Sequence, residues 1–169
     1  CATGRSDLVW TLRCSATCHS TMTQTGTPRG PSRHLEAVFG AGGWLSEHPA
    51  PFLSLLFNDA VVLEARPGTF VYRRDDQSNG LYGIVSGAIG IEGGHRRQSP
   101  LLGHIMRSGE WLGIKALLHG GPRQLTYRAI EPTRLVFIAR TRLVPLMQKD
   151  PTIAVRAVQL AEIGTRRGA

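Results

Sequence analysis

The sequence predicts a mainly β domain with flanking helices, arranged as a sandwich or a small barrel. From Val61 onward, short runs of β-branched and aromatic residues alternate with glycine, proline and asparagine turns, about every eight to twelve residues. Two interruptions of this rhythm have helical spacing instead. The chain has 169 residues, of which 41% are hydrophobic and 19% charged, enough for one domain with its own core.

The first ordered element we expect is a helix over about residues 50–58. Phe52, Leu53, Leu55 and Leu56 have helical spacing, and proline is tolerated only in a first turn, which places the helix start beside Pro51. The predicted strands follow: Val61–Ala65, Thr69–Arg73, Leu81–Val85, Ala88–Glu92, Leu101–Met106, Leu125–Ala129 and Arg134–Ala139.

The two helical interruptions are Ile114–His119 and the stretch from about Thr141 to the end. Within the second, Asp150 followed by proline is a favourable helix opening, with the aspartate as N-cap. Ile153, Ala157 and Leu160 then form an apolar stripe at helical spacing.

Residues 1–33 are expected to form a disordered leader, because serine, threonine, glycine and proline dominate them. The chain begins with cysteine, so residues before Met22 are interpreted as a non-native extension. Cys14, Cys18 and His19 could hold a metal as a thiolate and imidazole cluster, but a closed site usually needs four ligands, and we predict no metal.

Charge and hydropathy exclude several classes of protein. The net charge is +8, but 18 of the 20 basic residues are arginine, a bias that more often reflects a GC-rich genome than a nucleic-acid surface. No apolar run approaches the roughly 20 residues of a membrane-spanning helix, and no signal peptide is visible. We expect a cytoplasmic domain without membrane contact.

The segment from Ser108 to Ala129 could build an anion pocket. It places a glycine at a strand end, a one-turn helix, a glycine loop and then Pro122-Arg123. An arginine on the returning strand would clamp an anion against the start of the helix. An ordinary strand–helix–strand corner with a surface arginine explains the same residues.

Four spaced motifs carry a family resemblance: Pro67-Gly68, the turn at Asp75-Asp76, the run 81–87 (LYGIVSG) and the block 109–129. Together they resemble a cyclic nucleotide-binding domain, and more narrowly the sensor half of bacterial Crp/Fnr transcription regulators. The resemblance implies an eight-stranded antiparallel jelly roll over residues 34–149, with residues 150–169 starting a C-terminal dimerisation helix.

The resemblance also implies a ligand site. Gly113 and the N–H groups of the helix at Lys115 and Ala116 would bind the phosphate, and Arg123 would neutralise it. Ile114 stands where the family has a glutamate for the ribose hydroxyl, so the pocket is expected to be degenerate and cAMP binding weak or absent; Ile114→Glu is expected to strengthen it.

Two neighbours of Arg123 complete the predicted site. Gln124 could donate its amide to an anion, which leaves cAMP, cGMP or another small anionic ligand open. Leu125 replaces a small residue and is expected to narrow the pocket.

The predicted function is a ligand-sensing regulatory domain of a Crp/Fnr-like regulator, and the alternative is a ligand-silent jelly roll for dimerisation or protein interaction. No nucleophile–base pair can be assembled, so we predict no enzyme. A weak homodimer through Ile153, Ala157 and Leu160 is expected. DNA would be bound only through a helix-turn-helix domain that these residues do not contain.

Overall fold

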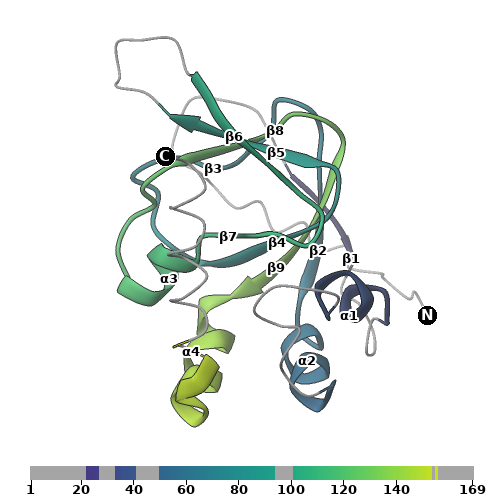
Figure 1. Cartoon of the computed structure of the whole chain (residues 1–169), viewed down its shortest axis with the longest axis vertical. Coiled ribbons are helices and arrows are strands. Elements are labelled where there is room, and N and C mark those ends of the chain that lie inside the picture. Colours follow the sequence, from purple (N-terminus) through teal and green to yellow (C-terminus); the bar gives the residue numbers. More distant parts are fainter. Residues whose placement is uncertain (1–21, 27–32, 41–49, 94–100, 154, 156–169) are drawn as a thin grey trace, which may run out of the picture.

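A computed structural model describes residues 22–26, 33–40, 50–93, 101–153 and 155, which form two antiparallel sheets with helices at one end (Figure 1). One sheet has the strand order β1-β2-β9-β4-β7 and the other β3-β8-β5-β6. The strands are β1 (Thr23–Gly26), β2 (Val61–Ala65), β3 (Phe70–Tyr72), β4 (Gly80–Ser86), β5 (Ala88–Gly93), β6 (Leu101–Arg107), β7 (Trp111–Leu112), β8 (Thr126–Ala129) and β9 (Thr133–Ala139). The helices are α1 (Arg33–Gly40), α2 (Ala50–Phe57), α3 (Ile114–His119) and α4 (Arg140–Lys149).

Strands β2–β9 confirm the predicted eight-stranded antiparallel roll, and β1 adds one further strand at the edge of β2. The expectation of a leader without structure over residues 1–33 is therefore wrong for 22–26 and for Arg33, which begins α1. Met22 packs against the core between the sheets, and Thr23 pairs with Glu64 of β2. A four-residue polar strand carries no apolar alternation, so its pairing depends on the free edge that β2 offers. Cys14, Cys18 and His19 lie outside the described residues.

Strand β4 runs through the middle of the core because it is buried on both faces. Leu81 and Val85 face the helices, whereas Tyr82 and Ile84 face the space between the two sheets, as strand alternation requires. The helix-side cluster also contains Leu35, Phe39, Leu53, Leu56, Phe57, Ala60, Ile114, Leu117, Val136, Ile138, Leu143 and Ile153. The cluster between the sheets also contains Leu63, Ala65, Val71, Tyr72, Ile89, Leu112, Ala129 and Leu135.

Asp150 separates α4 from a following helical turn at residues 151–153. Its Oδ1 accepts a hydrogen bond from the Thr152 backbone N–H at 3.0 Å, which is the N-cap that the sequence predicts. Ile153, predicted for a dimer face, is instead 1% exposed and packs in the chain's own helix-side core. Ala157 and Leu160 lie outside the described residues. No helix in the described ranges combines the length and the apolarity that crossing a bilayer demands.

Candidate functional site

The candidate site is the turn that connects β7, α3 and β8. Trp111 and Leu112 of β7 pair with β4, and Gly113, with φ +91°, turns the chain into α3. Gly120 ends the helix with φ +68°, and its N–H donates to the Ala116 carbonyl at 3.0 Å. Positive φ favours glycine at both ends, so the sequence around α3 permits only a short helix between two sharp turns.

Arg123 is the central side chain of this site and is only 2% exposed. Its Nη2 donates to the Gly80 carbonyl at 2.7 Å and to Asn79 Oδ1 at 3.2 Å, and its Nη1 donates to the Gly113 carbonyl at 3.3 Å. The guanidinium carbon lies 4.1 Å from the centre of the Tyr72 ring, a cation–π distance. Nη1 also fills the space that a Cβ at position 113 would need. Gly113 and Arg123 are therefore in direct contact, as the spacing of the sequence motif predicts.

The guanidinium of Arg123 takes part in no salt bridge within the described part of the chain. Among the same residues its buried Nε–H has no hydrogen-bond partner. Burying a charge costs several kcal/mol unless it is compensated, and an unpartnered buried donor costs about 1–3 kcal/mol. An anion that reached this guanidinium would relieve both costs.

Three tyrosines lie between the sheets beside Arg123. The Tyr72 ring centre is 4.8 Å from that of Tyr127 and 5.8 Å from that of Tyr82. Burial, above all, raises the pKa of Tyr72 well above its ordinary value, while the charge of Arg123 opposes that shift. Burial likewise raises the pKa of Tyr127. The hydroxyls of Tyr72 and Tyr127 therefore remain neutral at pH 7, and the three rings form an aromatic wall in this part of the interior.

The backbone of Arg123 is fixed to the turn that follows β3. Its carbonyl accepts from the Asp75 N–H and its N–H donates to the Asp76 carbonyl, both at 2.8 Å. Asp76 also closes its own turn, because its Oδ2 accepts from the Arg73 N–H at 2.7 Å. The two aspartates therefore act as turn formers, and Asp75 has the left-handed backbone (φ +71°) that aspartate tolerates.

Ile114 and Leu125, which the resemblance places at the ligand pocket, differ in burial. Ile114 is 8% exposed and packs in the helix-side cluster, next to Leu117 of the same helix. Leu125 is 38% exposed, so its side chain does not narrow the interior of the roll.

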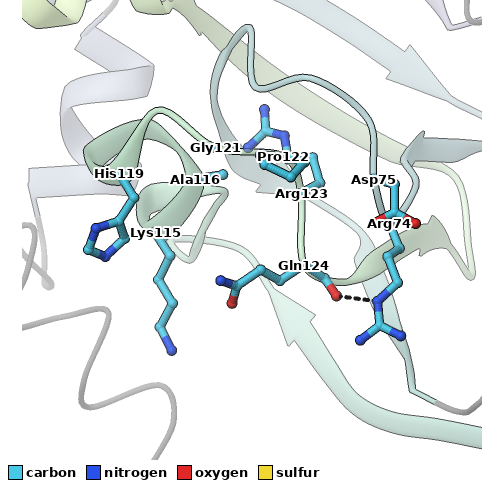
Figure 2. A pocket seen from close by; sticks show the side chains of 9 residues that line it. All are labelled: Arg74, Asp75, Lys115, Ala116, His119, Gly121, Pro122, Arg123 and Gln124. Atoms are coloured by element: carbon cyan, nitrogen blue, oxygen red, sulfur yellow. Dashed lines mark hydrogen bonds between the residues drawn. The ribbon is translucent and has the colours of Figure 1, made fainter.

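The remaining predicted residues, Lys115, Ala116 and Gln124, line a pocket beside α3 together with Arg123. Figure 2 shows Lys115 and Gln124 pointing to one side of the segment 121–124 and the Arg123 guanidinium pointing to the other. The pocket has a volume of about 350 Å³. It is lined by Arg74, Asp75, Lys115, Ala116, His119, Gly121, Pro122, Arg123 and Gln124.

Sequence reasoning missed Asn79 and Gly80 as partners of Arg123. The nearest sequence signal is that these two residues stand at the start of β4, the strand that pairs with β7. The described residues gather no group of three or more histidine, cysteine, aspartate or glutamate side chains around a metal position.

Known proteins resemble this chain in sequence and in fold. The sequence pattern of the cyclic nucleotide-binding domain matches residues 62–150. A protein of Rhodopseudomonas palustris named "Putative potassium channel protein" is 29% identical over 109 residues, which are 63% of this chain and 26% of that protein. The chain thus spans about a quarter of the length of this curated relative.

Two solved structures have the same fold. A cyclic nucleotide-binding domain from Methylobacillus flagellatus has a TM-score of 0.72 at 16% identity, over 87% of this chain and 85% of that one. The sensor domain of the transcriptional regulator DNR from Pseudomonas aeruginosa has a TM-score of 0.66 at 15% identity, over 79% of this chain and 89% of that one. With the family pattern spanning both sheets, α3 and Arg123, the chain belongs to the cyclic nucleotide-binding domain family.

Proposed function

We propose that this chain is the ligand-sensing domain of a Crp/Fnr-type transcription regulator and that it binds a cyclic nucleotide weakly. The observation that carries the proposal is the guanidinium of Arg123, which is 2% exposed, forms no salt bridge with any described residue and lies against Gly113. Such a group is stabilised by an incoming phosphate, which is the part that cAMP and cGMP share.

Weak binding follows from the position of Ile114. Its side chain is apolar and packs in the helix-side core, so it offers no acceptor to a ribose 2′-hydroxyl. A hydrogen bond to a charged group contributes about 1.5–3 kcal/mol, and its loss corresponds to about one to two decades in affinity. Tyr72 must also yield some of its contact with Arg123 before a phosphate can reach the guanidinium.

Calorimetric titration of the full chain with cAMP, cGMP and 2′-deoxy-cAMP tests the proposal. We expect dissociation constants of tens of micromolar or weaker, and equal affinity for cAMP and its 2′-deoxy analogue within about threefold. A sub-micromolar constant for cAMP, or a tenfold preference for the 2′-hydroxyl, would contradict the degenerate pocket.

A pair of matched arginine variants tests the role of Arg123 in the same titration. Arg123→Lys keeps the charge but loses the planar fork, so binding should fall below detection. Arg142→Lys is the control, because Arg142 is exposed and pairs with Asp59 at 2.8 Å away from the site. Equal binding by both variants would refute the assigned role.

The interior aromatic cluster favours a second candidate, a ligand-silent module for dimerisation or protein interaction. Tyr72, Tyr82 and Tyr127 already fill the space beside Arg123 with rings in contact. If neither cyclic nucleotide produces heat at millimolar concentration while the chain remains folded, this candidate replaces the first.

The rest of the proposal concerns the protein to which this domain belongs. We assign the chain no catalytic role and expect it in the cytoplasm, with DNA contacted only by a separate helix-turn-helix domain. A weak homodimer would form through the C-terminal helix over residues 150–169. Sedimentation velocity should show reversible dimerisation at hundreds of micromolar, weakened by Leu160→Glu; a strict monomer would argue against it.

A further inference from the structure

Asn79 and Gly80 form an asparagine–glycine pair next to Arg123. Asn79 belongs to no strand and is exposed, whereas Gly80 is buried and is the first residue of β4. Neither residue has a positive φ, so the pair does not form the tight hairpin turn that asparagine followed by glycine favours. The glycine is required for close packing instead, because a Cβ at position 80 would fall on the Ile138 carbonyl oxygen. The fold therefore keeps a glycine directly after an exposed asparagine.

An asparagine followed by glycine carries the chemistry of spontaneous deamidation. Asparagine is chemically labile, and the backbone nitrogen of the next residue can attack its side-chain amide carbon. Glycine obstructs this attack least, because it has no Cβ. In this chain the Gly80 nitrogen would lose its proton to water and bond to Asn79 Cγ, while the Cγ–Nδ2 bond breaks and ammonia leaves. Water then opens the cyclic imide, so that asparagine and water give ammonia and either aspartate or isoaspartate, with no oxidation or reduction.

The Gly80 nitrogen is not held by the neighbouring strand β9. The Arg140 N–H donates to the Asn79 carbonyl at 2.9 Å, which makes these two residues a hydrogen-bonded pair at the end of the ladder. Such pairs alternate along an antiparallel ladder, so Gly80 and Ala139 form a non-hydrogen-bonded pair. The Gly80 carbonyl accepts from Arg123 Nη2 instead, and the N–H of the same residue points to the same side, away from β9. The attacking nitrogen is therefore outside the ladder.

Arg123 connects this pair to the interior of the roll. Its Nη2 donates to Asn79 Oδ1 at 3.2 Å. During attack on the amide carbon, negative charge develops on this oxygen, where a fixed guanidinium stabilises it. In the product a carboxylate replaces the amide, beside a guanidinium that forms no salt bridge with any described residue.

We propose that Asn79 is a modification site, at which spontaneous deamidation places a carboxylate against Arg123 and ends anion binding inside the roll. The amide is neutral and leaves the charge of the guanidinium available to a ligand. The carboxylate neutralises that charge and repels an incoming phosphate. Because the ammonia is lost, the fraction of modified chains increases with the age of the protein. The loss of binding rests on the proposed function, whereas the modification rests only on the residues at 79 and 80.

Peptide mass spectrometry of the folded full chain, aged at mildly alkaline pH, tests the modification. The chain has two asparagines, and Asn58 is an internal control because it is also exposed but is followed by Asp59. We expect Asn79 to convert to aspartate and isoaspartate about tenfold or more faster than Asn58. Asn79→Gln should remove the conversion at this position, because the longer side chain closes a larger ring more slowly. Equal conversion of the two asparagines, or none at position 79, would overturn the modification site.

The consequence for Arg123 is tested with a matched pair of variants, Asn79→Asp as the product and Asn79→Gln as its neutral counterpart. Calorimetric titration should give an affinity for cAMP about tenfold or more lower for Asn79→Asp than for Asn79→Gln. Urea unfolding without ligand should give the higher midpoint for Asn79→Asp, because the buried guanidinium gains an anionic partner. Equal affinities would overturn the effect on binding, and equal midpoints would overturn the ion pair. If cAMP binds to neither variant nor to the unaltered chain, the proposed function fails, while the mass spectra and the midpoints still decide the modification.

Discussion

Replacing Gly113 by alanine should destabilise the fold in two ways, through backbone strain at position 113 and through displacement of the Arg123 guanidinium. A non-glycine residue at φ +91° costs about 1–2 kcal/mol. The new methyl group also falls on Arg123 Nη1, so the guanidinium must move and give up its 2.7 Å hydrogen bond to the Gly80 carbonyl. A charge-assisted bond of this kind contributes about 1.5–3 kcal/mol. We therefore expect Gly113→Ala to lower the free energy of unfolding by about 3–5 kcal/mol.

The assay is urea unfolding, with Gly109→Ala as the matched control. Gly109 has the same φ of +91°, but its nearest neighbour to an added Cβ is the Val38 carbonyl at 3.6 Å, an ordinary contact. This control should cost only the strain, about 1–2 kcal/mol. In a chain that already carries Arg123→Ala, the cost of Gly113→Ala should fall to the same value. Equal costs at 109 and 113, or an undiminished cost in the double variant, would refute the reasoning.

Three further predictions concern the core, the tyrosines and the last helix. Ile114→Glu should destabilise the chain by more than about 2 kcal/mol and leave cAMP affinity unimproved, because the carboxylate enters the apolar helix-side cluster; tighter binding would show that position 114 faces the ligand. The folded pKa values of Tyr72 and Tyr127 lie above the unfolded value near 10, so the folded chain keeps protons that the unfolded chain releases. The contribution of these tyrosines to stability is thus full below about pH 10 and is lost as the pH rises above it. Denaturant midpoints measured against pH should fall less steeply for Tyr72→Phe than for the unaltered chain. An equally steep fall in the two would contradict this prediction. Asp150→Ala should lower stability by about 1 kcal/mol through loss of the cap on Thr152, measured by thermal unfolding against Asp59→Ala, which should cost less.

Seven of the strands were predictable from sequence because each of those seven carries its own signal. β2 begins and ends as predicted, β4 is longer than predicted by one residue at each end, and β9 is longer by one residue at its start, since β-branched runs between glycine turns define them locally. The two-residue strand β7 was missed, because two residues show no alternation. β1 was missed because its pairing depends on a distant strand, not on its own composition.

The candidate site was predictable in its loop and not in its side-chain directions. The glycine–helix–glycine–arginine spacing placed Gly113 and Arg123 together, and the hydrogen bond between them agrees with that. The orientation of Ile114 was not predictable, because it depends on how α3 rotates to cover the helix-side core. Likewise, nothing local to Asn79 indicates that a residue 44 positions later donates to it.

Strand β1 has a practical consequence for producing the protein. Its residues Thr23–Gly26 occupy the outer edge of β2, whose sequence is VVLEA. If the chain is shortened to begin after Gly26, a β-branched strand is left with unpaired N–H and C=O groups and becomes a template for edge-to-edge association. Shortened versions should therefore precipitate at concentrations where the full chain stays dispersed, and a lysine introduced at Val62 would be the remedy to try first.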